Sequence, residues 1–147
     1  KHLRILCWFM TDGEILEKAK RVRDTWAKNC DITLFMSSTG NPDFPAIGLN
    51  VTSGRDHIAN KSRTAWNHVY RYYRNQADFF MKSDPDSYVS IPNLRLFLSG
   101  RDPTKPELYG HALHYGFQKW MGNFSGFYSA GQSVVLTRVA LVKMVSG

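Results

Sequence analysis

The sequence predicts an α/β fold in which a mainly parallel, Rossmann-type sheet has helices on both faces. Three short, almost continuous apolar runs are typical of strands that are covered on both sides: Arg4–Met10, Ile32–Met36 and Asp78–Lys82. The segments between these runs have apolar residues at helical spacing. The 147 residues, 43% of them hydrophobic, are enough for one domain with a buried core.

Four segments are predicted to be helices: 14–26, 56–74, 90–99 and a last one for which Thr137 is a suitable N-cap. Apolar residues recur every three or four positions and form a stripe along each helix. The positions expected to face the core are Ile15, Ala19, Val22 and Trp26 in the first helix, Ile58, Ala65, Val69 and Tyr73 in the second, and Val139, Val142 and Val145 in the last.

The remaining segments are predicted to be loops or extended. Residues 37–46 are rich in Ser, Gly, Asn and Pro and are expected to form a loop, after which Ile47–Val51 is a short extended piece. Glu107–Leu113 resembles another strand, and residues 115–136, rich in glycine and aromatic residues, are expected to be hairpin-like. Strands and helices therefore alternate along most of the chain, which is the order found in parallel sheets.

Charge and hydropathy exclude some classes of protein and leave others open. The 19 Lys and Arg residues exceed the 12 Asp and Glu residues, so the formal net charge is +7. A basic surface attracts anions, but a basic protein without a polyanion partner is equally expected. Because the charges are spread over the predicted helices, we expect no nucleic-acid partner. The apolar runs are far shorter than the ~20 residues that span a bilayer.

The strongest candidate for chemistry is Asp84-Pro85-Asp86, at the carboxyl end of the third apolar strand. Ligands of open α/β sheets bind beyond the carboxyl ends of the strands. Two carboxylates at i and i+2 can converge on one Mg²⁺ or Mn²⁺ ion, which in turn can hold a diphosphate. The same residues, followed by Ser87, also suit a plain type I turn, and the sequence leaves both interpretations open.

Two further basic residues, Arg55 and Lys82, are candidates for a contact with a phosphate. Arg55 can hold a phosphate or pair with a carboxylate, and Asp56 suits the positive end of the helix dipole where the second helix begins. Lys82 can neutralise the acidic turn or a phosphate, or it can be a solvated lysine at a strand end. The sequence does not choose between these interpretations.

Cysteines and glycosylation sequons give a mild indication of the cellular compartment. Cys7 lies in an apolar strand and is expected to be a reduced core thiol, whereas Cys30 is expected to pair with a cysteine outside these residues. Asn50, Asn60 and Asn123 each begin an N-glycosylation sequon. Three sequons favour a protein of the secretory pathway.

Several segments, taken in order, carry a resemblance to a known family. They are Ile5–Thr11, Thr25–Ala27 with Cys30, Leu34–Ser38, Asp43–Leu49, Gly54–Asp56, Phe80–Val89 and Asn93–Arg95. Their order and spacing over nearly the whole chain resemble the animal core 1 β1,3-galactosyltransferases, within the larger Fringe-like β1,3-glycosyltransferase group. This combination is far more specific than the Asp-x-Asp pattern alone.

The resemblance implies a GT-A fold, of which residues 1–147 are one partial domain, the portion that binds the nucleotide sugar. It implies a type II membrane enzyme of the Golgi with a lumenal catalytic domain and a membrane anchor before Lys1. Such an enzyme uses Mn²⁺ and transfers galactose, with inversion, from UDP-galactose to the 3-hydroxyl of N-acetylgalactosamine (GalNAc) on Ser or Thr of a glycoprotein. Whether it forms a homodimer is left open.

The resemblance also assigns roles to individual residues. Asp86 is the first expected Mn²⁺ ligand, and Asp84 is a second metal ligand or a contact of the donor sugar. Thr11 matches the region that lines the uridine pocket. Arg55 and Asp56 match residues near the donor.

Three features depart from the pattern of the family. Pro85 replaces the middle residue of an Asp-Asp-Asp motif, and Ser129–Val134 stands in place of a Ser-Gly-Gly-Ala-Gly-Tyr segment that floors the active site. The distal segment of the family, which supplies the catalytic base and a metal-binding His, has no counterpart, so we expect the C-terminal part to be missing and these residues alone to be inactive. The alternative is a degenerate relative that acts as a binding or chaperone-like partner of an active enzyme.

Overall fold

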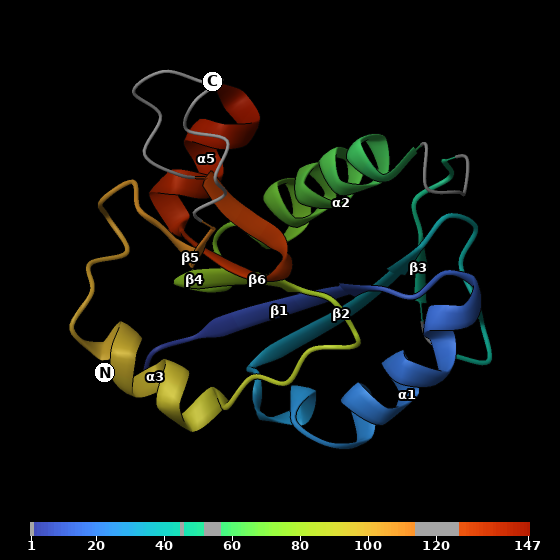
Figure 1. The fold of residues 1–147 in the computed structure, drawn as a ribbon. Helices are drawn as coiled ribbons and strands as arrows, with labels where there is room; N and C mark the ends of the chain where they lie inside the picture. The colour runs from blue at the N-terminus through green and yellow to red at the C-terminus, as the bar shows by residue number, and fades with distance from the viewer. Residues whose placement is uncertain (1, 45, 52–56, 114–126) are drawn as a thin grey trace, which may run out of the picture.

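The computed structural model describes residues 2–44, 46–51, 57–113 and 127–147, which contain one sheet in the order β3-β2-β1-β4-β6-β5 (Figure 1). The strands are β1 (Ile5–Met10), β2 (Ile32–Ser37), β3 (Ala46–Gly48), β4 (Phe79–Ser83), β5 (Leu108–Leu113) and β6 (Phe127–Thr137). The helices are α1 (Leu16–Asp24), α2 (Ile58–Tyr73), α3 (Ile91–Ser99) and α5 (Arg138–Ser146), with the 3₁₀ turns η1 (Gly13–Ile15) and η2 (Ala27–Asn29). Within these ranges, no helix has the length and apolar character needed to cross a bilayer.

The sheet has a larger parallel part and a smaller antiparallel part. The strands β3, β2, β1 and β4 run parallel, and Trp8 of β1 lies opposite Leu34 of β2 and Lys82 of β4. β6 runs antiparallel to both β4 and β5. The predicted α/β class with a mainly parallel sheet is therefore confirmed.

Helices cover both faces of the sheet, as the sequence predicts. In Figure 1, α1 and α3 lie below the sheet, whereas α2 and α5 lie above it. Alternate residues of β1 face the two layers: Ile5, Cys7 and Phe9 pack with α1 and α3, and Leu6 and Trp8 pack with α2 and α5. Each face therefore has its own hydrophobic core, which explains why the central strands are apolar throughout.

The predicted inward positions of the helices are wrong near some helix ends. Ile15 is 41% exposed because it belongs to the 3₁₀ turn ahead of α1, where three residues per turn shift the stripe. Ile58 is 52% exposed and is the first residue of α2. In α5, Val139 and Val142 are only half-buried, because the face that packs on the core runs through Leu141.

Thr137 caps α5, as predicted. Its Oγ1 accepts hydrogen bonds from the N–H groups of Ala140 (3.2 Å) and Glu107 (3.1 Å), and it donates to the carbonyl of Lys105 (2.6 Å). One hydroxyl thus begins the helix and also joins it to the segment that leads into β5.

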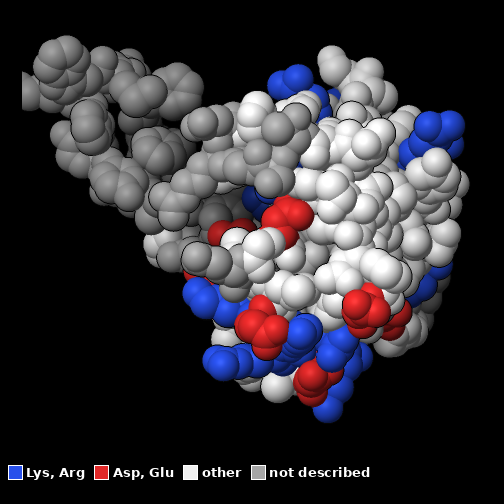
Figure 2. Space-filling model, turned by 90° about the vertical axis from the view of Figure 1, so that its right-hand side faces the viewer, with Lys and Arg blue, Asp and Glu red and all other residues white. Residues whose placement is uncertain are grey.

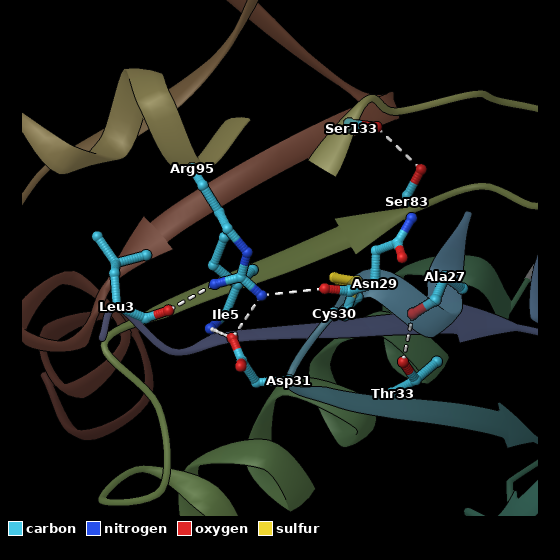
Figure 3. Close-up of a disulfide and its surroundings, with 11 residues drawn as sticks. Leu3, Ile5, Ala27, Asn29, Cys30, Asp31, Thr33, Ser83, Arg95 and Ser133 are labelled. Carbon is cyan, nitrogen blue, oxygen red and sulfur yellow. Dashed lines mark hydrogen bonds and ion pairs between the residues drawn. A yellow bond between two sulfur atoms is a disulfide. The ribbon is translucent and has the colours of Figure 1, made fainter. Parts of the chain in front are cut away.

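Cys7 and Cys30 form a disulfide, with their Cα atoms 6.2 Å apart. The expectation that Cys7 is reduced and that Cys30 pairs outside these residues is therefore wrong. Cys30 lies just before β2 (Figure 3), and the parallel register of β1 and β2 places Cys7 opposite Thr33. The sequence separation of 23 hides this proximity, because the proximity depends on which strands become neighbours.

The amino ends of β1 and β2 are joined through Asp31. Its carboxylate accepts hydrogen bonds from the Ile5 N–H (2.8 Å) and from the guanidinium of Arg95 (2.8 Å). Arg95, from α3, also donates to the carbonyl of Leu3 (2.6 Å), as Figure 3 shows. This aspartate therefore connects two strands and a helix at the amino edge of the parallel strands.

Asp78 has the same function at the start of β4. Its carboxylate accepts from the Arg4 N–H (2.9 Å) and from the guanidinium of Arg138 (2.7 Å). Arg138, in the first turn of α5, also donates to the carbonyl of Ala77. β1, β4 and α5 are thereby joined at the same edge.

Candidate functional site

The parallel strands β1, β2 and β4 end at one edge of the sheet, on the right of the view in Figure 1. Thr11 and Asp12 follow β1, Ser38 follows β2 and Asp84 follows β4. Figure 2 looks onto this carboxyl edge and shows acidic and basic side chains close together near the middle of the face. The candidate residues of three separate strands therefore lie along one edge.

The acidic segment after β4 is a turn. The Ser87 N–H donates to the carbonyl of Asp84 (3.0 Å), Pro85 is buried, Asp84 is half-buried and Asp86 is exposed. Neither carboxylate accepts a hydrogen bond from any residue that the structure describes. The predicted turn is therefore present, and it is compatible with a metal site, because its hydrogen bond joins backbone atoms and does not use the carboxylate oxygens.

The electrostatics of this turn favour a cation. Burial raises the pKa of Asp84, the positive charge of Lys82 opposes this effect, and the negative charge of Asp86 adds to it. Carboxylate oxygens are ligands that Mn²⁺ accepts. Among the described residues, no three His, Cys, Asp or Glu side chains gather closely enough to hold a metal. Asp84 and Asp86 therefore fit part of a coordination sphere, whose other ligands would be phosphate oxygens or further groups.

Thr11 is buried between the ends of β1 and β2. Its backbone N–H and its Oγ1 both donate to the carbonyl of Met36, at 2.9 and 3.2 Å. The side chain is thus engaged within the fold at the edge where the nucleotide is expected. Its position beside a uridine pocket stays a prediction.

A polar cluster of Asp12, Ser38 and Lys61 lies at the same edge and was missed by the sequence reasoning. The Asp12 carboxylate accepts from the Ser38 N–H (2.8 Å), from the Ser38 hydroxyl (3.0 Å) and from Lys61 Nζ (2.8 Å). Burial by itself raises the pKa of Asp12, but the hydrogen bonds from Lys61 and Ser38 outweigh it and lower the pKa. The cluster joins the β1 turn, the end of β2 and the first turns of α2.

A signal for this cluster is present in the sequence. Lys61 stands four residues before Ala65, on the stripe that was expected to be apolar, and its side chain is only 10% exposed. A lysine on a buried helix face requires an anionic partner. Which carboxylate supplies it depends on the packing of α2 on the sheet, and the sequence does not show this.

Lys82 is the second lysine on the α2 side of the edge. It is half-buried, its Nζ lies 3.5 Å from the hydroxyl of Ser62 on α2, and it lies 5.7 Å from the centre of the Trp8 ring. The Trp8 ring in turn meets Trp66 edge to face. Lys82 therefore lies over the Trp8 ring, close in the chain to the acidic turn.

The Ser129–Val134 segment belongs to β6. Ser133 lies opposite Ser83 in the β4–β6 ladder, and the two hydroxyl oxygens are 2.9 Å apart (Figure 3). Ser83 directly precedes Asp84. Ser129–Val134 is the segment that departs from the glycine-rich pattern of the family. It therefore pairs with β4 directly beside the acidic turn.

Some predicted residues lie outside the described part of the chain. They are Arg55, Asp56 and Asn123, so the predictions for them stay untested. The other two sequon residues, Asn50 and Asn60, are exposed, which glycosylation requires.

The mixed sheet with helices on both faces and an acidic turn at its carboxyl edge is consistent with a GT-A-like glycosyltransferase fragment. Over its whole length, the chain is 38% identical to glycoprotein-N-acetylgalactosamine 3-beta-galactosyltransferase 1 of Xenopus laevis, which confirms the resemblance to the core 1 β1,3-galactosyltransferases. Over 84% of its length, it is 23% identical to beta-1,3-glucosyltransferase of Mus musculus. No protein-family model matches the chain.

The chain spans 39% of the length of the Xenopus protein and 25% of the length of the mouse protein. Both relatives are glycosyltransferases by name, so the similarity supports glycosyl transfer in general. The particular donor, metal and acceptor are a separate question.

Proposed function

We propose that this chain is the nucleotide-sugar-binding portion of a β1,3-galactosyltransferase. The whole enzyme transfers galactose, with inversion, from UDP-galactose to the 3-hydroxyl of GalNAc on Ser or Thr of glycoproteins. The observation that carries the proposal is the similarity of the entire chain to the Xenopus protein of that name. The position of Asp84 and Asp86 at the carboxyl edge of the sheet supports it, because nucleotides bind at this edge in open α/β sheets.

Within this proposal, Asp86 and Asp84 hold Mn²⁺ and Thr11 borders the uridine. Bound Mn²⁺ supplies positive charge that stabilises the UDP leaving group. The Ser87–Asp84 hydrogen bond fixes the turn, so that its two carboxylates are positioned before a ligand arrives. Pro85 restricts the turn further without removing either outer carboxylate.

The catalytic base belongs to another part of the protein in this proposal. An inverting transfer needs a base that takes the proton from the acceptor hydroxyl. The Xenopus relative is more than twice as long as this chain, since the chain spans 39% of it. The residues described above therefore bind and orient the donor, and the acceptor chemistry is completed elsewhere.

We further propose that the protein acts in the Golgi lumen, with a membrane anchor before Lys1. Two observations support an oxidising secretory compartment: the Cys7–Cys30 disulfide and the exposure of Asn50 and Asn60. Disulfides persist in such compartments and are rare in the cytosol.

The test is a calorimetric titration of UDP into the folded chain, with Mn²⁺ and with EDTA, repeated on Asp86→Ala. Asp24→Ala, which removes an exposed carboxylate on α1, is the matched control. We expect binding that requires Mn²⁺, is lost in Asp86→Ala and is retained in Asp24→Ala. Absence of UDP binding by the folded chain, or binding that is indifferent to both Mn²⁺ and Asp86, would contradict the proposal.

Substrate choice is tested on the whole protein. Release of UDP is measured with UDP-galactose, UDP-glucose and UDP-N-acetylglucosamine, each with a GalNAc-bearing glycopeptide as acceptor. We expect turnover with UDP-galactose and at least about tenfold less with the others, since a hydroxyl that a site hydrogen-bonds is strongly discriminated. A preference for another donor would retain glycosyl transfer and reject the galactosyl assignment.

A further inference from the structure

The two lysines on the α2 side of the carboxyl edge differ in their partners. Lys61 Nζ lies 2.8 Å from the carboxylate of Asp12. Lys82 Nζ has a long contact of 3.5 Å with the Ser62 hydroxyl and rests on the Trp8 ring. No carboxylate of the described residues lies within 4.0 Å of Lys82. Among the residues that the structure describes, Lys61 therefore has a carboxylate partner and Lys82 has none.

The described residues around Lys82 do not place a carboxylate in contact with its ammonium group. A half-buried ammonium loses part of its hydration, and this loss is costly unless an anion replaces the water. The Trp8 ring offers a weak cation–π attraction. The Trp8 side chain is fully buried, and its Nε1–H has no acceptor among the described residues. Trp8 therefore does not supply a negatively charged group for Lys82.

The position of Lys82 fits an anion that also contacts the acidic turn. Lys82 lies in β4, two residues before Asp84, and its positive charge acts on the Asp84 carboxylate. No ion pair joins the Lys82 ammonium to the Asp84 carboxylate, and its hydrogen bond among the described residues is the 3.5 Å contact with the Ser62 hydroxyl. A diphosphate that contacts a cation at the acidic turn would also be near Lys82, because Lys82 precedes Asp84 by two residues.

We propose that Lys82 binds the diphosphate of the nucleotide-sugar donor, and this inference rests on the proposed function. In it, Lys82 supplies a fixed positive charge that complements the charge at the Asp84–Asp86 turn. Lys61 has a different role, because Asp12 already neutralises it and it joins α2 to the edge. Lys82 thus contributes to the phosphate part of donor binding and leaves the binding of the uridine moiety unchanged.

The test compares two ligands in Lys82→Met, which keeps an unbranched side chain of nearly the same length and removes its charge. Affinity for UDP at saturating Mn²⁺ is measured by calorimetry, and affinity for uridine, which has no phosphate, by ligand-observed NMR. We expect Lys82→Met to weaken UDP binding about tenfold and to leave uridine binding within twofold. Lys82→Arg, which restores the positive charge, is expected to recover most of the UDP affinity.

The matched control is Arg74→Met at the far end of α2. Arg74 also lies over an aromatic ring, that of Tyr70 at 4.8 Å, so its removal deletes one positive charge and one cation–π contact away from the edge. We expect UDP affinity in this variant to stay within twofold of the wild type. A loss equal to that of Lys82→Met would show a general effect of net charge and would reject the role of Lys82.

The failure of this inference is distinguishable from the failure of the proposed function. If the wild-type chain binds UDP and Lys82→Met binds it equally well, only the role of Lys82 is wrong. The same holds if UDP and uridine affinities fall together, because a structural change affects both ligands. If the wild-type chain does not bind UDP, the proposed function and the inference both fail.

Discussion

The two edges of the parallel strands use their aspartates in opposite ways. At the amino edge, Asp31 and Asp78 each accept hydrogen bonds from a backbone N–H and from an arginine of a packed helix. At the carboxyl edge, Asp84 and Asp86 accept none from the described residues. Asp12 lies at the carboxyl edge but resembles the amino-edge aspartates, because its carboxylate accepts hydrogen bonds from a backbone N–H and from a basic side chain. The charges of the amino edge thus stabilise the fold, whereas those of the acidic turn have no such partners among the described residues, as the proposed metal site requires.

The pKa shifts follow the same division. Burial tends to raise the pKa of both Asp31 and Asp84. At Asp31, hydrogen bonds from His2, Ile5 and Arg95 outweigh burial and lower the pKa. At Asp84 the pKa stays raised, because the charge of Lys82 does not overcome burial. The hydrogen-bond partners, more than burial, therefore set the direction of the pKa shift at these two carboxylates.

The largest expected effect concerns the disulfide beside the amino edge. Replacing both cysteines, Cys7→Ala with Cys30→Ala, is expected to lower the free energy of unfolding by about 3 kcal/mol, since the crosslink constrains the unfolded chain. Denaturant titration of the oxidised wild type and the double variant measures the difference. A loss below about 1 kcal/mol would show that this bond contributes little to the amino edge.

Next in size is the loss of Asp78. Asp78→Ala is expected to cost about 2 kcal/mol of stability, because it leaves Arg138 and the Arg4 N–H without their carboxylate. The control is Asp24→Ala, whose exposed ion pair with Arg23 is expected to contribute less than about 0.5 kcal/mol. Similar losses of unfolding free energy in the two variants would contradict a stabilising role of Asp78 at the amino edge.

A smaller effect is expected at Asp12, and it depends on pH. The folded-state pKa of Asp12 lies below its ordinary value of 3.8, so its carboxylate stabilises the fold above that pH. This contribution is lost as the pH falls through the lowered folded-state pKa. Asp12→Asn is therefore expected to lose about 1 kcal/mol at neutral pH.

The pH profile tests the origin of that loss. Thermal unfolding of the wild type and Asp12→Asn, measured from pH 7 to pH 2, is expected to converge at the acid end. A difference that stays constant over this range would mean that the ionised carboxylate is not the cause. Lys61→Met, which removes the main cationic partner, is expected to show the same convergence.

The smallest effect on stability is expected at Asp86. The residue is exposed and forms no hydrogen bond with the described residues. Asp86→Asn is therefore expected to stay within about 0.5 kcal/mol of the wild type in chemical unfolding. A larger loss would place Asp86 among the structural carboxylates and weaken its assignment as a metal ligand.

Local patterns in the sequence predicted the strands, the helices and the edge where the acidic turn lies. The apolar runs identified β1, β2 and β4 because both faces of these strands are covered. The acidic turn was found because its residues are adjacent in the chain. Such features depend on residues that are close in the sequence, so the periodicity of apolar residues and the residue preferences of turns predict them.

Features that depend on packing were missed or assigned wrongly. The Cys7–Cys30 disulfide requires the pairing of β1 with β2, and the Asp12–Lys61 pair requires the position of α2 on the sheet. The exposure of Ile58 has the same origin, since Lys61 takes the buried position near the start of α2. Each of these depends on contacts between residues far apart in the chain.

The most direct test of this account measures two aspartate variants, one from each edge, with two readouts. Asp78→Asn and Asp86→Asn are compared in unfolding free energy and in Mn²⁺-dependent affinity for UDP under conditions where both are folded. The account predicts that Asp78→Asn loses stability and keeps its UDP affinity, whereas Asp86→Asn keeps its stability and loses the Mn²⁺-dependent affinity. If both readouts change together in either variant, the division between a structural amino edge and a ligand-binding carboxyl edge is wrong.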